Sequence, residues 1–361
     1  MKKIIIVAGD KSGDIYGALL SEKLKNKFSS LKIYSLGGNA LRQYSHQLIN
    51  LTSYSVSGIY EALIKLNKFI NIFQKALWYI DDIKPDLIIL IDFPDFNLRL
   101  AKKLNKNYPI FYYVSPQVWA WREKRIEIIR KYIDKMVVIF KFEQDFYIKK
   151  GIKTLYFGHP LLEIISPASE YKRKNIISFL PGSRKNEIKH HLPILNKTYK
   201  ILKEKLNDYL FRIIKSENIE DNYYKKYARG LSLIPHSYKA LGESKFIIAS
   251  SGTATIEMAI LEIPHLIIYK INPLSWYLLK KMVKTKYIGM VNILSSHRIV
   301  EELLQKDINP QKIAEVTLEY INNKDKYTLI QRKLREVKEI LTPYGATDKF
   351  SNYIGKYLNI I

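Results

Sequence analysis

Cysteine is absent from this chain of 361 residues. Its absence excludes a disulfide framework and any metal site built on thiolates, and it fits a reducing compartment. Glycine and proline are sparse, at 15 and 13 residues, and we find neither an internal repeat nor a low-complexity tract. Because 47% of the residues are hydrophobic, the chain can bury a substantial core. A chain of this length favours two domains.

Long hydrophobic runs are missing as well. The longest, such as Leu87–Ile91, have the length of a strand and are far too short to cross a bilayer. The opening residues, MKKIIIVAGD, contain an apolar run too short for a signal peptide, and it leads directly into a turn. We therefore interpret that run as a first strand.

Acidic residues are outnumbered, with 34 Asp and Glu against 59 Lys and Arg, which gives a net charge of +25. Such a field attracts nucleic acid, an anionic membrane surface or a phosphorylated substrate. Biased codon usage is an alternative source, because Lys, Ile, Asn and Tyr are all abundant. The cations are spread along the chain and not gathered in a tail, so we expect no nucleic-acid partner.

Short apolar segments alternate with helical segments through both halves of the chain. The predicted strands are Lys3–Ala8, Lys32–Leu36, Asp86–Ile91, Ile110–Val114, Lys135–Phe140, Thr154–Phe157, Ile176–Leu180, Phe211–Ile214, Ser232–Ile234, Phe246–Ala249 and His265–Tyr269. The main predicted helices are Ile15–Lys25, Ile59–Ile80, Leu98–Lys103, Leu192–Lys205 and Thr255–Leu261. Buried strands that alternate with helices predict parallel sheets covered on both faces.

The fold class is therefore α/β, with two facing Rossmann-like doubly wound domains and a cleft between them. We place the linker in the polar stretch that follows Gly158–Pro160. The first domain is predicted at residues 1–165 and the second at 166–325. The helices of 326–361 are expected to pack back toward the first domain.

Two segments of the second half each combine a buried strand, a turn and a helix start. They are Phe179–Glu187 (FLPGSRKNE) and Ile247–Glu257 (IIASSGTATIE). Helix starts present unpaired N–H groups and a partial positive charge, so the two turns together suggest a nucleotide diphosphate site; ordinary strand-to-helix turns are the alternative. The candidate donor-binding residues are Gly182, Ser183, Arg184, Ser251, Gly252, Thr253 and Glu257.

Two of these side chains have specific candidate roles. Arg184 offers a guanidinium fork suited to phosphate oxygens, although a surface salt bridge would also explain it. Glu257 could accept hydrogen bonds from ribose hydroxyls, and a solvated helix face is its alternative. No metal ligand set is visible, because the histidines lack ligand spacing and no D-x-D pair follows a strand. We expect no metal or cofactor, so Arg184 and the helix start would stabilise a departing diphosphate.

Asp92 is the candidate catalytic residue of the first half. It lies in Ile91–Asn97 (IDFPDFN), just past an apolar strand, where open α/β sheets bind ligands. A carboxylate there can act as a general base toward a hydroxyl. The alternative is a helix-capping role, which we assign to Asp95 or Asn97.

Two further strand-end segments supply candidate acceptor residues. Gly9–Gly17 (GDKSGDIYG) matches neither a dinucleotide fingerprint nor a P-loop, and a plain tight turn would also explain it. Tyr112–Arg125 (YYVSPQVWAWREKR) carries two tryptophans, which we expect on one short helix that binds a sugar face or an acyl chain; core packing is the alternative. The candidate cleft residues are Ser12, Gly13, Asp14, Gln117 and Trp119.

Two amphipathic stretches combine apolar faces with lysines. Ile59–Ile80 has an apolar stripe flanked by Lys65, Lys68 and Lys75, and Pro273–Tyr287 interleaves aromatic and apolar residues with four lysines. Both could contact an anionic bilayer surface, and buried amphipathic helices explain both equally simply.

Taken together, these motifs resemble the lipid-A-disaccharide synthase family. The likeness covers nearly the whole chain, and YVSPQVWAWR (Tyr113–Arg122) is its most specific part. The other matching segments are Gly9–Asp14, Ile91–Asn97, Leu180–Ile188, Ser251–Glu257 and Lys286–Leu294. The resemblance implies an inverting glycosyltransferase of GT-B architecture. Its substrates would be UDP-2,3-diacylglucosamine and 2,3-diacylglucosamine 1-phosphate (lipid X), and its products a β-1,6 disaccharide 1-phosphate and UDP.

The resemblance also implies residue roles and a location. Asp92 would draw the proton from the acceptor 6-hydroxyl, Arg184 would lie near the donor phosphate, and Asn292 would lie close to the donor. The family commonly has Glu where this chain has Asp10, so we leave Asp10 out of the catalytic set. The implied enzyme is cytoplasmic and peripherally associated with the inner membrane, and a homo-oligomer is compatible with the sequence.

Two other functions remain open at the level of sequence. A UDP-sugar 2-epimerase would use the same architecture. A non-enzymatic protein that binds a membrane surface through its basic charge would need no catalytic carboxylate.

Overall fold

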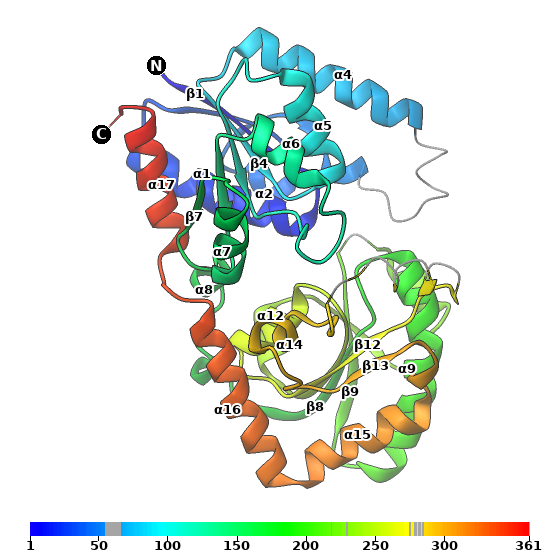
Figure 1. The fold of residues 1–361 in the computed structure, drawn as a ribbon. Helices are drawn as coiled ribbons and strands as arrows, with labels where there is room; N and C mark the ends of the chain where they lie inside the picture. Colours follow the sequence, from blue (N-terminus) through cyan, green and yellow to red (C-terminus); the bar gives the residue numbers. More distant parts are fainter. Residues whose placement is uncertain are drawn as a thin grey trace. The chain divides into compact units, whose positions relative to one another are not determined.

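The computed structural model describes all residues except 55–65, 218, 229, 274, 275, 278, 279, 281, 282, 284 and 361. The chain forms two compact units (Figure 1). The first unit contains Met1–Glu163 and Leu341–Ile361, and the second contains Ile164–Ile340. The last two helices therefore belong to different units: α16 (Lys324–Ile340) is part of the second unit and α17 (Ala346–Tyr357) is part of the first.

The described part of the first unit holds a seven-stranded parallel sheet in the order β3-β2-β1-β4-β5-β6-β7. Its central strands are continuous apolar runs, and Ile4, Ile5 and Ile6 of β1 are fully buried, as expected for a sheet covered on both faces. The strands are β1 (Lys3–Ala8), β2 (Lys32–Gly37), β3 (His46–Asn50), β4 (Leu87–Ile91), β5 (Ile110–Tyr113), β6 (Lys135–Val138) and β7 (Thr154–Tyr156).

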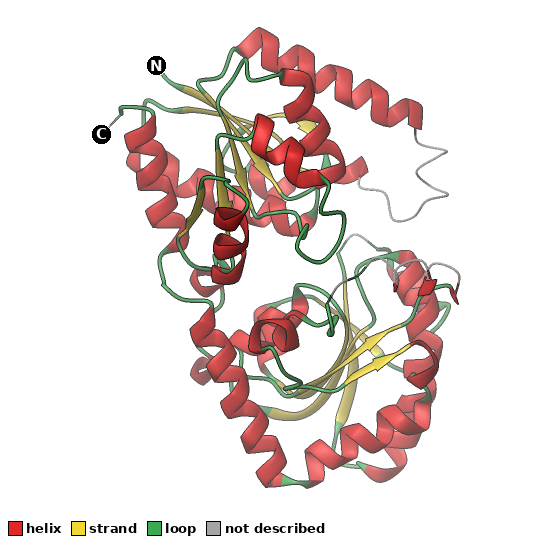
Figure 2. Cartoon of the chain, in the orientation of Figure 1, coloured by secondary structure: helices red, strands yellow, loops and turns green. Residues whose placement is uncertain are grey.

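Helices cover both faces of this sheet (Figure 2). One core joins the side chains of Ile5 and Val7 to helices α4, α5 and α6, while α1 packs against β1 and α17. Gly355 lets α17 approach closely, because a Cβ there would lie 2.5 Å from Cζ of Phe28. The helices of the unit are α1 (Lys11–Lys27), α2 (Asn39–Arg42), α4 (Leu66–Ile83), α5 (Pro94–Leu104), α6 (Arg125–Tyr132), α7 (Lys141–Lys149), α8 (Leu161–Ile164) and α17, with a 3₁₀ turn at Thr52–Tyr54.

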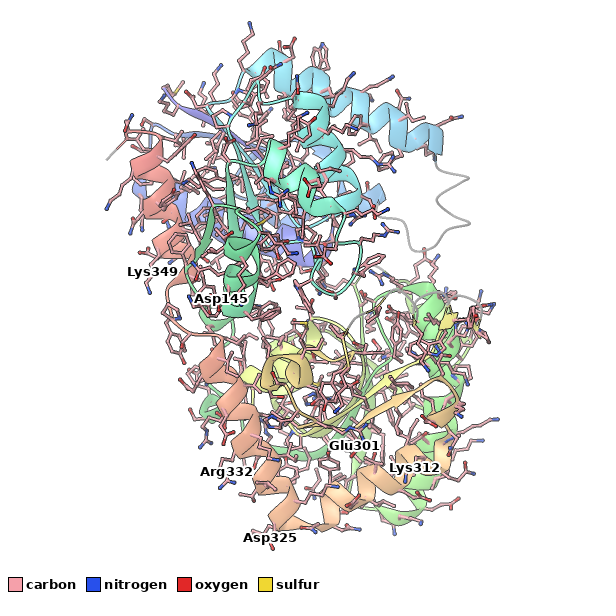
Figure 3. All side chains as sticks on the ribbon, in the orientation of Figure 1. Asp145, Glu301, Lys312, Asp325, Arg332 and Lys349 are labelled. Atoms are coloured by element: carbon pink, nitrogen blue, oxygen red, sulfur yellow. The ribbon has the colours of Figure 1, made fainter. Side chains whose placement is uncertain are left out.

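The described part of the second unit holds a six-stranded parallel sheet in the order β10-β9-β8-β11-β12-β13. The strands are β8 (Lys174–Leu180), β9 (Leu210–Lys215), β10 (Ser232–Pro235), β11 (Ser244–Ser250), β12 (His265–Tyr269) and β13 (Glu302–Leu304). The helices are α9 (Lys185–Lys205), α10 (Asp221–Lys225), α11 (Tyr238–Gly242), α12 (Ala254–Ile260), α14 (Met290–Ser295), α15 (Pro310–Asn322) and α16, with 3₁₀ turns at Ala168–Glu170 and Gln305–Asp307. Exposed charges such as Lys312, Asp325 and Arg332 lie along α15 and α16 (Figure 3).

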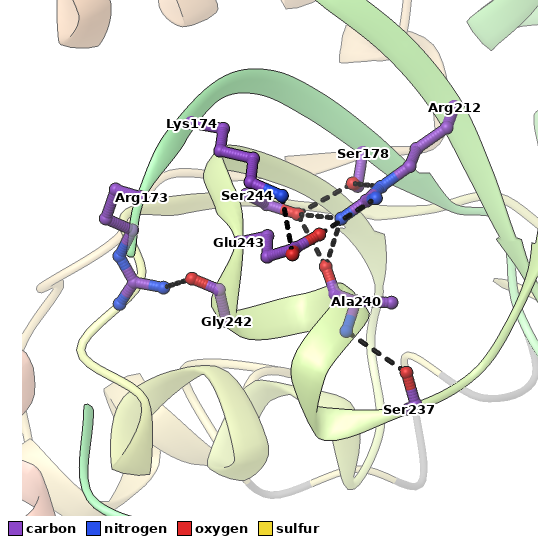
Figure 4. Close-up of polar contacts among 9 residues, drawn as sticks. All are labelled: Arg173, Lys174, Ser178, Arg212, Ser237, Ala240, Gly242, Glu243 and Ser244. Atoms are coloured by element: carbon purple, nitrogen blue, oxygen red, sulfur yellow. Dashed lines mark hydrogen bonds and ion pairs between the residues drawn. The ribbon is translucent and has the colours of Figure 1, made fainter. Parts of the chain in front are cut away.

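A polar cluster ties the strands of the second sheet together near their amino ends (Figure 4). Arg212 of β9 donates to Oγ of Ser178 at 3.1 Å and lies 3.6 Å from the Glu243 carboxylate. That carboxylate also pairs with Lys174 at 2.7 Å, and the hydroxyls of Ser178 and Ser244 are 2.7 Å apart. These bonds satisfy the polar groups of this edge within the protein. The turns that carry the candidate residues lie at the opposite edge.

The prediction of two doubly wound parallel α/β units is confirmed. The elements that the sequence analysis did not identify are β3, β13, α6, α7 and the short helices α2, α8, α10, α11 and α14. The sequence analysis also placed the start of α5 at Leu98, whereas the helix begins at Pro94. Of the two amphipathic stretches, the part of Ile59–Ile80 up to residue 65 and much of Pro273–Tyr287 lie outside the described residues.

Candidate active site

The candidate residues of the first unit share one edge of its sheet. Because β1, β4, β5 and β6 are neighbours and run parallel, the segments that follow them gather at their carboxyl ends. These segments contain Ser12, Gly13, Asp14, Asp92, Gln117 and Trp119. Open α/β sheets bind ligands at this edge.

Asp92 lies in an unusual turn after β4. Its φ is 42° and that of Phe93 is 46°, so two consecutive residues other than glycine occupy the left-handed region. Side chains hold this conformation, because the Asp92 carbonyl accepts from Asn97 Nδ2 at 2.7 Å and from the Tyr112 hydroxyl at 2.6 Å. Such strained turns concentrate at functional sites. Asp92 itself is partly exposed.

The predicted capping roles of Asp95 and Asn97 are wrong. The N-cap of α5 is Phe93, and it makes no side-chain capping bond. Asn97 is fully buried and donates to the carbonyls of Ile91 and Asp92, so it supports the turn and not the helix start. Asp95 is exposed and pairs with Arg122 at 3.1 Å, and it also pairs with Arg125.

Asp92 is paired with Asp10, a residue that the sequence analysis set aside. Asp10 caps α1, where its carboxylate accepts from the backbone N–H of Gly13 at 2.6 Å. Although Asp92 is partly exposed as a residue, its carboxyl is enclosed by protein groups. This burial, together with the charge and hydrogen bonding of Asp10, holds the pKa of the carboxyl well above its usual range. The two turns touch because residue 9 is glycine, where a Cβ would lie 2.1 Å from the Phe93 ring.

The three GDKSGD candidates differ in their surroundings. Ser12 is partly exposed in the first turn of α1, and Gly13 is buried. Asp14 is buried, and its carboxylate accepts from the backbone N–H groups of Gly38 at 2.6 Å, Ala40 at 2.9 Å and Leu41 at 3.2 Å. Those bonds anchor the start of α2. Asp14 therefore fixes the backbone beside the candidate site.

The two tryptophans lie in a turn-rich loop before α6, so the prediction of a shared short helix is wrong. Gln117 is exposed, while Trp119 is partly buried and donates from Nε1 to Glu143 Oε1 at 3.0 Å. The guanidinium of Arg122 stacks over the Trp121 ring at 4.3 Å. Glu143 was not identified from the sequence, although an acidic residue in the first turn of a helix after a strand is a usable signal.

The turn after β8 carries Gly182, Ser183 and Arg184. Gly182 has a φ of 122°, and a Cβ there would lie 2.3 Å from Oε2 of Glu187. That Oε2 accepts from the backbone N–H groups of Ser183 at 2.9 Å and Arg184 at 3.3 Å. A protein carboxylate thus occupies two donors that we expected to face phosphate. The Arg184 side chain remains 63% exposed, with its guanidinium 3.4 Å from Glu187.

A buried histidine joins this turn to a second strand. His191 Nε2 accepts from the Lys270 backbone N–H at 2.9 Å, and its Nδ1 lies 2.7 Å from the Pro181 carbonyl. The tautomer with a proton on Nδ1 satisfies both bonds. Burial lowers the pKa of His191 to about 4, so the ring is neutral and its role is structural.

The turn after β11 is open to solvent. Gly252 and Thr253 are exposed, and Ser251 is partly exposed and donates from its hydroxyl to the Ile288 carbonyl at 3.1 Å. Because β8 and β11 are parallel neighbours, this turn and the Arg184 turn lie at the same edge. Glu257 of α12 lies 3.0 Å from Nε2 of His236, which is therefore a further polar residue of this region.

Asn292 is fully buried, and its amide is fully hydrogen bonded within the protein. Its Nδ2 donates to the Val300 carbonyl at 2.9 Å and to Glu302 Oε1 at 2.8 Å. Its Oδ1 accepts from the backbone N–H groups of Ile299 at 2.7 Å and Val300 at 3.1 Å. Glu302 also accepts from the backbone N–H of Ile288 at 3.0 Å. Asn292 thus supports the segment whose carbonyl binds Ser251.

Within the described ranges, no three His, Asp or Glu side chains are grouped so that they could hold a metal ion. A search of the described helices also finds none with the length and apolar character needed to cross a membrane.

A family profile described as lipid-A-disaccharide synthetase matches residues 4–347. The chain is 36% identical to lipid-A-disaccharide synthase 1 of Legionella pneumophila (strain Lens), over 94% of this chain and 93% of that protein. It is 33% identical to the lipid-A-disaccharide synthase of Syntrophus aciditrophicus, over 96% of both chains.

Solved structures agree with the fold. A Staphylococcus aureus MnaA structure with UDP superposes with a TM-score of 0.68 at 15% identity, covering 100% of this chain and 98% of that chain. A sucrose-phosphate synthase from Thermosynechococcus elongatus superposes with a TM-score of 0.57 at 11% identity, covering 100% of each chain. At such identities the likeness establishes the GT-B-like fold alone. The family match and the curated relatives go further: the chain belongs to the lipid-A-disaccharide synthase family, the glycosyltransferases that make the disaccharide of lipid A.

Proposed function

We propose that this enzyme transfers 2,3-diacylglucosamine from UDP to the 6-hydroxyl of 2,3-diacylglucosamine 1-phosphate (lipid X). The products are the β-1,6-linked tetraacyl-disaccharide 1-phosphate and UDP. The bond between the donor anomeric carbon and the UDP oxygen breaks as the acceptor oxygen attacks from the opposite face, which inverts the anomeric configuration. Membership of the family and the motif resemblance support these substrates.

The observation that carries the proposal is the placement of Asp92. It is partly exposed at the ligand-binding edge of the first sheet, in a left-handed turn held by Asn97 and Tyr112. We assign Asp92 as the general base that takes the proton of the acceptor hydroxyl. Burial of its carboxyl and then its pairing with Asp10 raise its pKa, which makes it a stronger base once it is ionised.

The donor side of the reaction is assigned to the second unit. The exposed guanidinium of Arg184 suits a diphosphate, and the open turn of Ser251, Gly252 and Thr253 lies along the same edge. We assign to Glu257, which pairs with His236, the hydrogen bonds from the ribose hydroxyls. We assign Asn292 a supporting role, because its amide is saturated by protein groups.

We further propose that the enzyme works in the cytoplasm on the anionic surface of the inner membrane, where its acylated substrates reside. Most of the apolar stripe of α4 packs into the core of the first unit, since Ile72, Ala76 and Ile80 are buried. Among the described side chains of α4, the large apolar groups of Ile70 and Trp78 remain outside, at 44% and 61% exposure. Together with the lysines of this positively charged chain they suit an interfacial contact.

The test is a reaction of the purified full chain with UDP-2,3-diacylglucosamine and lipid X, analysed by mass spectrometry of the lipids and by UDP release. The proposal expects a disaccharide 1-phosphate that appears only when both substrates are present. UDP release that is independent of the acceptor, or a 2-epimer of the donor sugar as the only product, would overturn it. The second outcome matters because epimerase structures share the fold, with TM-scores such as 0.64 at 13% identity.

A further inference from the structure

Glu143 is a buried carboxyl group at the ligand-binding edge of the first sheet that the proposed mechanism does not use. It lies in the first turn of α7, directly after β6, and it is 2% exposed. Its Oε1 accepts from the Ser115 hydroxyl at 2.7 Å and from Trp119 Nε1 at 3.0 Å. Its Oε2 is buried without a hydrogen-bond partner among the described residues. Acidic side chains are almost never fully buried unless they are paired.

Helix α7 holds the loop after β5 at three points. Besides the two bonds to Glu143, the Tyr147 hydroxyl donates to the Pro116 carbonyl at 3.0 Å. The Trp119 ring also packs edge-on against Phe142, with the ring centres 4.9 Å apart. Gln117 lies between these anchor points and is exposed, so its position depends on the bonds that α7 makes.

Among the described residues, none of the groups with the largest effects on the Glu143 carboxyl is a cation. Asp92, at the end of β4, feels the negative charge of Glu143, which adds to the rise of the Asp92 pKa. Tyr147, on α7 itself, is affected in the same direction. Ser115 and Trp119 are neutral donors, and with the backbone of Phe140 they favour the ionised form of Glu143. Burial outweighs these donors and raises the pKa of Glu143 to about 7.

We propose that Glu143 is a positioning residue of the acceptor side, which fixes the Ser115–Trp119 loop by two hydrogen bonds. The assignment to the acceptor side rests on the proposed function. When Glu143 carries a proton, the loop keeps its anchor and Asp92 faces one negative charge fewer. When Glu143 ionises, its bonds to Ser115 and Trp119 strengthen and Asp92 becomes harder to ionise.

The first experiment needs no substrate. The intrinsic tryptophan fluorescence of the full chain is followed from pH 5 to pH 9, because ionisation of Glu143 changes the charge beside the Trp119 indole. The proposal expects a transition centred roughly at pH 7 in the unmodified protein, since burial shifts this carboxyl there. The transition should be absent in Glu143→Gln and in Trp119→Phe, and retained in Glu127→Gln, a matched change on exposed α6. A transition that survives Glu143→Gln, or none in the unmodified protein, overturns the titration of Glu143.

The second experiment separates positioning from folding. Glu143→Gln keeps an oxygen for Ser115 and Trp119, whereas Glu143→Ala removes it. We expect Glu143→Ala to lower kcat/KM for lipid X by roughly tenfold to 100-fold through KM, with KM for the donor unchanged. Glu143→Gln should restore most of that loss. Equal losses for both substrates, or no difference between Gln and Ala, would show that Glu143 serves the stability of the unit alone. If the unmodified chain makes no disaccharide, the proposed function fails while the fluorescence result still stands.

Discussion

Asp92 combines three features that rarely coincide at one residue. Its backbone is left-handed, its carboxyl shares hydrogen bonding with Asp10, and two side chains from α5 and β5 hold its carbonyl. A left-handed backbone at such a residue persists only where surrounding contacts hold it, and Asn97 and Tyr112 make those contacts. The second feature tunes the carboxyl for proton transfer, because a base works best when its pKa lies near the working pH.

The role of Asp92 is tested by Asp92→Asn. Asparagine tolerates a positive φ and keeps the size of the side chain, so the turn should survive while the base is lost. We expect kcat to fall at least about 100-fold with little change in thermal stability. The measurement is UDP release at saturating substrates, alongside a thermal melt. Turnover within a few-fold of the unmodified enzyme would assign the proton to another group.

The pair predicts a pH dependence whose sign follows from the raised pKa. Asp92 is active when ionised, so kcat/KM should rise with pH through the raised pKa of Asp92. Asp10→Asn removes a neighbouring negative charge and keeps a good helix cap. The rising limb of the pH profile should therefore move to lower pH. Asp95→Asn, an exposed change in the same loop, should leave the limb in place. A limb that does not move in Asp10→Asn contradicts the coupling.

Arg184 carries a prediction on the donor side. Its guanidinium is 63% exposed and lies 3.4 Å from Glu187, so it is free to turn toward a diphosphate. We expect Arg184→Ala to raise KM for the UDP donor by about tenfold to 100-fold, the range of one or two hydrogen bonds to a charged group. KM for lipid X should stay the same. Arg332→Ala, on the outer face of α16, is the control and should change neither value.

At the scale of elements, the central strands were predictable because their sequences are continuous apolar runs. The short polar strands were not predictable. β1 and β4 are buried on both faces, so their sequences are continuous and unmistakable. β3 (HQLIN) is half-buried at the sheet edge and β13 spans three residues, so neither carries such a run. The tryptophan loop was mistaken for a helix because its anchor, Glu143, lies on another element. Contacts of that kind, like the Asp10–Asp92 pair and the saturated amide of Asn292, follow from tertiary packing, and sequence spacing does not encode them.

Helix α4 carries a prediction for membrane contact. Because Ile70 and Trp78 are 44% and 61% exposed, replacing both with Gln should cost little stability. Binding to vesicles that contain anionic lipid should weaken at least about tenfold, since both apolar side chains would leave the interface. Leu329→Gln, which changes an exposed leucine of α16, should bind like the unmodified chain. Binding that is unchanged in the double variant would exclude this face as the contact.

At the scale of the whole molecule, the chain ends in the unit where it begins. After α16 it returns to the first unit, where Phe350 and Ile354 of α17 are buried. Hydrogen bonds also fix the return: the His159 backbone N–H donates to the Leu341 carbonyl at 3.0 Å, and the Tyr156 side-chain hydroxyl donates to the Thr342 carbonyl at 2.7 Å. The first unit, which holds Asp92, is thus completed by the last residues of the chain.

Gly355→Val tests how far the first unit depends on α17. A Cβ at this position would lie 2.5 Å from Cζ of Phe28, and Phe28 is only 7% exposed, so the ring has little room to move. We expect the added side chain to lower the free energy of unfolding of the first unit by about 1–3 kcal/mol, as overpacking does in other cores. The measurement is urea unfolding followed by far-UV circular dichroism, with Lys356→Val as the control for helix propensity on the exposed side of the same helix. Equal stability of the two variants would mean that α17 can shift on α1 without cost, and that the first unit does not need its C-terminal helix in this position.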